Sequence, residues 1–132
     1  MEKEDYLETI YKLKKENQQV RVSDLAGALG VSKPSVTQMI QRLHQEGLVV
    51  YRRYLTVNLT PKGRKIGKVV ADRHEVLADF FTFLGIPQHI QEKDIHGIEH
   101  HLSPVTLKKL RNVTQFLKNK VVKGGSVLGE KK

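Results

Sequence analysis

The sequence predicts a mainly helical protein with two domains, the first of which carries a short β-hairpin. Apolar residues recur at helical spacing along most of the chain. Serine or threonine followed closely by proline marks several helix starts. One short segment, LVVYRRYLTVNL, is rich in β-branched and aromatic residues instead. We expect the first domain over residues 1–62, the second over 63–120 and a disordered tail over 121–132.

Two helices are expected before the first tight turn. Residues 4–16 have apolar side chains at the spacing of one helical face. Ser23 is expected to cap a helix over residues 24–29, because its hydroxyl can accept a backbone N–H that has no partner within the helix. Gly30 is expected to end that helix, since glycine adopts the left-handed conformation common at this position.

A third helix and a hairpin complete the first domain. Ser32 caps this helix, Pro34 occupies its first turn, where a missing N–H costs nothing, and Gly47 ends it. Together with the preceding helix and the short turn it forms a helix-turn-helix. The hairpin that follows has Arg52 and Arg53 at its tip, so the domain is predicted to be a winged helix-turn-helix.

Three further helices are expected in the second domain. They comprise a long helix from Pro61 to Gly85, a second from Pro87 to about Leu102, and a third that begins at Pro104. The long helix has an apolar stripe that is either internal core or a seam between two copies of the chain. This stripe consists of Val76, Leu77, Phe80, Phe81 and Leu84.

The net charge of +9 is distributed unevenly along the chain. Residues 1–70 have a net charge of +6, residues 71–102 of −4 with five of the six histidines, and residues 103–132 of +7. Basic segments bind phosphate backbones or form solvated faces, whereas an acidic, histidine-rich centre suits a cation. The absence of cysteine excludes disulfide scaffolds and metal sites built on thiolates.

Other classes of protein lack support in the sequence. There is no apolar run of about 18 residues, and the amino-terminal segment lacks the apolar core of a secretory signal, so we expect a cytoplasmic protein without a membrane partner. The segment HEVLA lacks the second histidine of a zinc protease, and no G-x-S-x-G or glycine-rich phosphate loop occurs. We therefore expect no enzyme, with a metallo-hydrolase left as an alternative.

The predicted helix-turn-helix indicates binding to double-stranded DNA. The second helix of this motif normally enters the major groove, where Gln38 could pair with adenine and Pro34 could contact a thymine methyl group. Arg42 and the wing arginines are assigned to phosphates. The candidate contacts are Lys33, Pro34, Ser35, Thr37, Gln38, Arg42, Arg52 and Arg53. The alternative is a winged helix that contacts only proteins.

Six potential metal ligands lie on three predicted helices. Asp5 and Glu8 are spaced i, i+3 on the first helix, while His96, Glu99 and His100 are spaced i, i+3, i+4 on a later one. Imidazole and carboxylate together suit Mn, Fe, Co, Ni or Zn. Spacing leaves open whether the helices bring these groups together. The candidate ligands are Asp5, Glu8, His74, His96, Glu99 and His100.

Four segments resemble one family in the same order along the chain. The runs RVSDLAGALGVSKPSVTQMIQRL, LTPKGRKIGK, RHEVL and GIEHHLS resemble the diphtheria toxin repressor family of metal-dependent bacterial repressors, closest to its manganese transport regulator branch. The resemblance extends over about residues 4–117. It implies a homodimer whose amino-terminal domain binds operator DNA, whose carboxyl-terminal domain dimerises, and which represses metal-uptake genes when loaded with a divalent metal.

The resemblance also implies a ligand set. The positions that match family ligands are Asp5, Glu8, His74, Glu99 and His100. His96 stands where the manganese branch has Glu and the iron branch has Cys. An imidazole there replaces an anionic, bridging carboxylate, which leaves open whether one or two ions bind and shifts the preference toward Fe, Co or Zn. Mn(II) is expected first, with Fe(II), Co(II), Zn(II) or a non-metal effector as alternatives.

Overall fold

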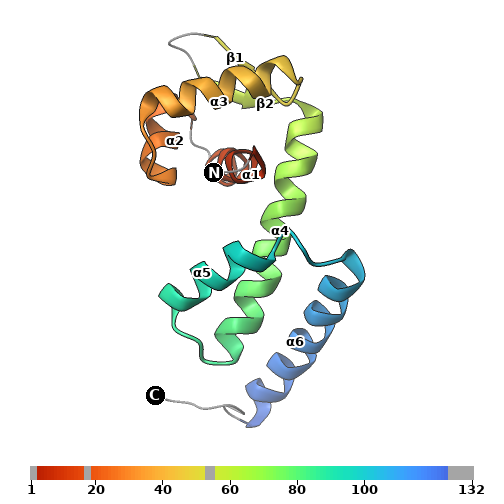
Figure 1. Ribbon diagram of the computed structural model, residues 1–132. Coiled ribbons are helices and arrows are strands. Elements are labelled where there is room, and N and C mark those ends of the chain that lie inside the picture. Colours follow the sequence, from red (N-terminus) through yellow and green to blue (C-terminus); the bar gives the residue numbers. More distant parts are fainter. Residues whose placement is uncertain (1–2, 17–18, 53–55, 125–132) are drawn as a thin grey trace. The chain divides into compact units, whose positions relative to one another are not determined.

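The computed structural model describes residues 3–16, 19–52 and 56–124, with the side chains of residues 121–124 excepted. The chain forms two compact units, residues 1–71 and residues 72–132, and helix α4 runs through the boundary (Figure 1). The helices and strands are α1 (Lys3–Lys15), α2 (Val22–Leu29), α3 (Lys33–Gln45), β1 (Val49–Tyr51), β2 (Val57–Leu59), α4 (Pro61–Phe83), α5 (Gln88–Ile98) and α6 (Pro104–Gly124). The predicted mainly helical fold with one hairpin is therefore confirmed.

The first unit is built around the helix-turn-helix. Its core joins side chains from α1, α2, α3 and both strands, and Ile10, Leu25, Ile40 and Leu43 in it are fully buried. Helix α3 thus has one apolar face directed into the core, which leaves its opposite face for solvent.

The capping of α2 differs from the sequence prediction. The helix begins at Val22, and the Asp24 carboxylate accepts the backbone N–H of Arg21 at 2.9 Å. The prediction that Ser23 caps this helix is therefore wrong. The neighbouring Asp24 instead accepts an N–H from the residue before the helix. The neighbouring predictions are confirmed. Gly30 ends α2 with φ 69°, and the Ser32 hydroxyl accepts the N–H of Ser35 at 3.2 Å.

A tight joint connects α3, the hairpin and α4. Strands β1 and β2 pair antiparallel, with Val50 opposite Asn58. The Thr60 hydroxyl donates to the Gly47 carbonyl at 2.7 Å and accepts the N–H of Gly63 at 3.1 Å, so it caps α4 and ties it to the end of α3. A Cβ on Gly63 would collide with the backbone oxygen of Leu48, so this joint requires glycine.

The second unit contains the end of α4 together with α5 and α6. Val76 and Leu77 of α4 pack with one residue from each of the other two helices, Ile95 and Leu107. Part of the apolar stripe of α4 is thus internal core, while Leu84 is 36% exposed. Helix α6 runs to Gly124, so residues 121–124 of the expected disordered tail are helical instead. Residues 125–132 lie outside the described residues. None of the described helices has the length and apolar character that crossing a bilayer requires.

Candidate metal centre and DNA-reading face

The face of α3 opposite the core is polar and exposed. Pro34 and Gln38 lie on it, two and six residues after the Ser32 cap, and both are exposed. Of the remaining candidate DNA contacts, Lys33, Ser35, Arg42 and Arg52 are exposed and Thr37 is half-buried. Arg53 lies outside the described residues. The side chains needed for groove and phosphate contacts are therefore accessible.

Two further glutamines share this polar face. Gln41 and Gln45 follow Gln38 by three and seven residues, so one helix face carries all three, and each of them is exposed. Glutamine amides can pair with adenine in the major groove. Both residues are absent from the predicted contacts, although the helical period already indicated them.

His44 connects the end of α3 to the hairpin. Its Nδ1 lies 3.2 Å from the carbonyl oxygen of Val49 and 3.4 Å from the backbone nitrogen of Tyr51. Both partners belong to β1. This histidine, which is not among the candidate ligands, therefore fixes the first wing strand against the helix.

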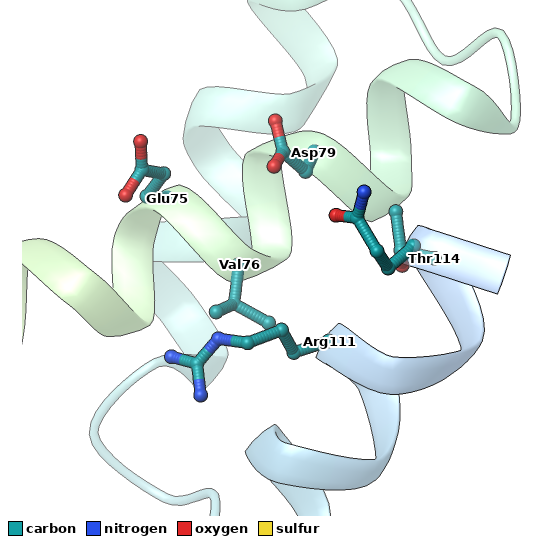
Figure 2. Close-up of a pocket in the computed structure, with 6 residues that line it drawn as sticks. Glu75, Val76, Asp79, Arg111 and Thr114 are labelled. Atoms are coloured by element: carbon teal, nitrogen blue, oxygen red, sulfur yellow. The ribbon is translucent and has the colours of Figure 1, made fainter. Parts of the chain in front are cut away.

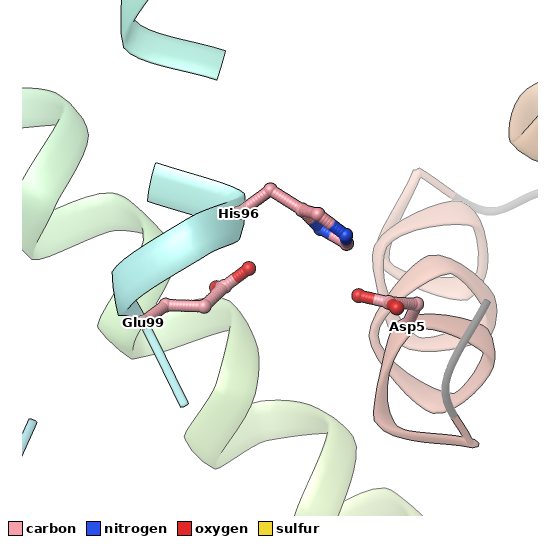
Figure 3. Close-up of side chains that lie close together, drawn as sticks. All are labelled: Asp5, His96 and Glu99. Atoms are coloured by element: carbon pink, nitrogen blue, oxygen red, sulfur yellow. The ribbon is translucent and has the colours of Figure 1, made fainter. Parts of the chain in front are cut away.

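Four candidate ligands gather in the second unit. Glu99 is buried, with 2% of its surface exposed, and its Oε1 lies 3.8 Å from Nδ1 of His74. A nitrogen of His96 lies within 4.8 Å of a Glu99 carboxylate oxygen, and the rings of His96 and His100 meet edge to face with centroids 6.4 Å apart. Figure 3 shows His96 and Glu99 extending from the same end of α5. One buried carboxylate thus has two imidazoles beside it, and a third contacts the ring of His96. We call His74, His96, Glu99 and His100 the imidazole cluster.

The end of α5 differs from the prediction, which extended this helix to about Leu102. The helix stops at Ile98, so His100 lies in the turn beyond it rather than on the helix. Glu99 is the C-cap and keeps helical angles, φ −60° and ψ −30°. It therefore remains on the helical path and one turn from His96, as the spacing predicts.

The first unit holds the other two candidate ligands on α1. Asp5 and Glu8 are both buried, at 6% and 7% exposure, and their i, i+3 spacing places them on one face of the helix. The Nζ of Lys12 lies 2.8 Å from Oε2 of Glu8. The position of Asp5 on α1 can be seen in Figure 3.

The donor set has a definite chemical character. It consists of carboxylate oxygens and imidazole nitrogens, and the chain has no thiolate. Such donors fit first-row divalent ions from Mn(II) to Zn(II) and disfavour Cu(I). More nitrogen donors favour the later ions of this series, and more carboxylates favour Mn(II).

A separate hollow of about 250 Å³ lies between α4 and α6 (Figure 2). It is lined by Glu75, Val76, Asp79, Arg111, Thr114 and Gln115. None of these is a candidate ligand, and Asp79 pairs with Lys118 at 3.5 Å. The hollow is therefore a polar groove between packed helices, distinct from the imidazole cluster.

Two family models match the chain in succession. The model described as "Iron dependent repressor, N-terminal DNA binding domain" matches residues 1–57, and "Iron dependent repressor, metal binding and dimerisation domain" matches residues 60–122. The exposed α3 face falls within the first match, and the imidazole cluster falls within the second.

Relatives and solved structures agree with these matches. The chain is 43% identical over 113 residues to the HTH-type transcriptional regulator MntR of Bacillus pumilus, covering 86% of the chain and 78% of that protein. The MntR of Bacillus subtilis is 42% identical over 113 residues, covering 86% and 80%. These relatives are transcriptional regulators and not enzymes.

Among solved structures, a manganese-dependent transcriptional repressor in complex with manganese gives a TM-score of 0.75 at 26% identity, covering 87% of this chain and 53% of that one. The manganese regulator SloR gives 0.73 at 26% identity, covering 86% and 54%. The chain spans about half the length of these two solved proteins. On the sequence matches, the chain belongs to the iron-dependent repressor family, also called the diphtheria toxin repressor family, within its manganese transport regulator branch.

Proposed function

We propose that this protein is a metal-dependent transcriptional repressor that binds operator DNA as a homodimer when loaded with a divalent ion, Mn(II) before others. It would act in the cytoplasm and control genes for metal uptake. The observation that carries the proposal is the buried carboxylate of Glu99, which has imidazoles of His74 and His96 beside it. A buried carboxylate among imidazoles is a favourable place for a divalent cation, because the cation offsets the cost of burying the charge.

The proposed ligands come from both units of the chain. Asp5 and Glu8 of α1 would join the cluster around Glu99 when the ion is present. Without an ion the three carboxylates repel one another, so a conformation that brings them together is disfavoured. A bound ion reverses the sign of this interaction and stabilises that conformation. The full proposed set is Asp5, Glu8, His74, His96, Glu99 and His100.

Metal binding is proposed to act on DNA affinity through the spacing of two recognition helices. A dimer reads two half-sites best when these helices lie about one DNA turn apart, ~34 Å. An ion that fixes α1 relative to the dimerisation domain would fix that spacing. Coupling of this kind amounts to about 1–3 kcal/mol, and bound DNA would tighten metal binding by the same factor.

The proposed boundaries follow the sequence prediction, with DNA binding assigned to residues 1–62 and metal binding and dimerisation to 63–120. Apolar side chains exposed in the second unit support dimerisation there, because a second copy could cover them. Those at least 36% exposed are Leu84, Ile90, Ile98, Val105, Val113 and Phe116. The first unit contributes the DNA contacts, for which the exposed face of α3 around Gln38 offers polar side chains.

The identity of the ion depends on His96. This residue adds a neutral nitrogen where the manganese branch has a carboxylate, so the proposed set contains three imidazoles and three carboxylates. Fe(II), Co(II) or Zn(II) is the alternative effector, since these ions bind imidazole more strongly than Mn(II) does.

A parallel titration tests the proposal. An operator would first be selected from random duplex DNA with Mn(II) present, and its affinity then measured with Mn(II), Fe(II), Co(II), Ni(II) and Zn(II). We expect at least one ion to tighten binding about 5- to 150-fold, and a chelator to reverse the effect. Metal stoichiometry per chain would show whether one or two ions bind. Equal affinity with every ion and with chelator would instead support a non-metal effector.

A further inference from the structure

An ion pair on α1 engages one of the proposed ligands. The ammonium group of Lys12 lies 2.8 Å from Oε2 of Glu8, one helical turn earlier. Counted over the side-chain atoms alone, Lys12 is 45% exposed and Glu8 is 9% exposed. The pair thus joins a buried carboxylate to a flexible side chain that has free access to solvent.

We propose that Lys12 is a built-in counter-cation for Glu8, which competes with the divalent ion and thereby sets the metal concentration at which the protein responds. The inference rests on the proposed function, because it takes Glu8 as a metal ligand. With the ammonium in place, the Glu8 charge is partly compensated in the metal-free protein. A metal ion that uses the same oxygen must displace this ammonium or share the oxygen with it.

Displacing the Lys12 ammonium from Glu8 is favourable only for a cation that binds the carboxylate more strongly. An ammonium carries a single charge and interacts with a carboxylate through N–H donors, whereas a divalent ion carries twice the charge and binds several donors at once. Lys12 can leave easily, since its side chain is 45% exposed and its ammonium group is rehydrated on release. The cost of this displacement raises the free ion concentration needed for half-saturation.

The other lysines of α1 make different contacts. Lys3 pairs with Glu46, the residue that follows α3. Lys14 donates to Asn58 of β2 at 2.9 Å, and Lys15 lies over the Tyr11 ring at 5.8 Å. These side chains provide matched controls, because they have the same charge on the same helix. Lys15 is the most useful of them, since its contact lies within α1 and involves neither strand of the hairpin.

The proposal predicts two effects of opposite sign when Lys12 is removed. The metal-free protein should become less stable, because a buried carboxylate loses its counter-charge. Metal affinity should rise, because a competitor is lost. A purely structural role would lower stability and leave affinity unchanged or weaker, so the opposite signs identify competition.

The experiment compares Lys12→Met, Lys12→Arg and Lys15→Met with the wild type in the full chain. Mn(II) affinity would be measured by electron paramagnetic resonance of the free ion, and thermal stability by calorimetry with a chelator present. For Lys12→Met we expect Mn(II) binding about 2- to 5-fold tighter and a lower melting temperature. Lys12→Arg should resemble the wild type, and Lys15→Met should keep wild-type affinity.

Two results would overturn the inference while leaving the proposed function intact. One is unchanged or weaker Mn(II) binding by Lys12→Met. The other is equal tightening by Lys15→Met, which would indicate a general effect of charge along the helix. If the wild type binds no divalent ion in the same titration, the proposed function fails first, and the inference fails with it.

Discussion

The two units of the chain differ in how they bury apolar side chains. In the first unit one cluster draws on α1, α2, α3 and both strands, and its largest members are fully buried. In the second unit the buried cluster consists of Val76, Leu77, Ile95 and Leu107. The second unit also exposes most of the large apolar side chains that are accessible in the described residues.

This difference indicates that the two units are stabilised in different ways. A unit with a continuous core can hold a recognition helix rigidly without assistance. A unit with a small core and exposed apolar side chains gains more from partners that bind only its folded form, such as the proposed ion and second copy. Variants that affect one unit and leave the other unchanged would test whether the two units differ in this way.

The largest expected effect comes from Glu99→Ala in the second unit. Removing the buried carboxylate should weaken metal binding by more than about 100-fold, since even residues outside the ligand shell contribute 10- to 100-fold. Operator affinity should then no longer respond to metal, while the folded first unit keeps its helical signal. Titration calorimetry measures metal binding, and circular dichroism measures the helical signal. Glu92→Ala, an exposed site on the same helix, is the control, and a wild-type metal response in Glu99→Ala would contradict the ligand assignment.

Glycine substitutions provide a second contrast between the units. A Cβ on Gly63 would collide with the backbone oxygen of Leu48, so Gly63→Ala forces the α3–α4 joint apart. We expect a loss of about 1–3 kcal/mol in the free energy of unfolding. A Cβ on Gly97 of α5 would meet no atom of the described residues within 4 Å, and Gly97→Ala should stabilise the protein by up to about 1 kcal/mol. Urea titrations measure both, and equal effects would show that the joint is not tightly packed.

The sequence predicted the helix starts better than the helix ends. Ser32 and Thr60 could be identified as caps from the sequence because each lies shortly before a proline at a helix start. The hydrogen bond that each cap accepts comes from a backbone N–H only three residues later. The prediction for Ser23 was wrong because serine and aspartate both cap helices, and the adjacent Asp24 forms the bond instead. Nothing in the sequence indicates that α5 ends at Ile98, where the N–H of His101 bonds back to its carbonyl. Leu102 packs into the second core, so tertiary contacts accompany this ending.

For the candidate site, the sequence supplied residue types and local spacing. The neighbours of Glu99 on α5 and in the following turn could be predicted, since they are close in the chain. The approach of His74 to Glu99 could not, because it depends on how α4 packs against α5 over 25 residues of separation. The Glu8–Lys12 pair has the i, i+4 spacing of many exposed ion pairs, and that spacing alone does not indicate that the carboxylate is buried.

A third prediction concerns DNA recognition by the first unit. Gln38→Ala should weaken binding to the operator by about 1–2 kcal/mol. It should also relax the sequence preference at the one base pair that this residue contacts. Lys33→Ala should weaken binding to all sequences and reduce the slope of log affinity against log salt by about 0.9. Binding to operator variants at several salt concentrations separates the two. If Gln38→Ala changes every sequence equally, that residue contacts phosphate rather than a base.

The smallest expected effect lies in the exposed pair between Lys3 and Glu46. The hydrogen bond from Lys3 lowers the pKa of Glu46, and the charges of Lys3, Arg42 and Lys62 add to this. A carboxyl whose pKa is lowered by folding stabilises the protein above the pKa of the unfolded chain, and this contribution is lost as the pH falls through the lower, folded value. Lys3→Met should therefore raise the pKa of Glu46 toward the ordinary glutamate value, as followed by its carboxyl resonance in NMR. The stability difference between wild type and variant should vanish in acid. Lys15→Met should leave the Glu46 titration unchanged, and a similar rise there would show that the shift comes from the overall charge of α1 and not from the hydrogen bond.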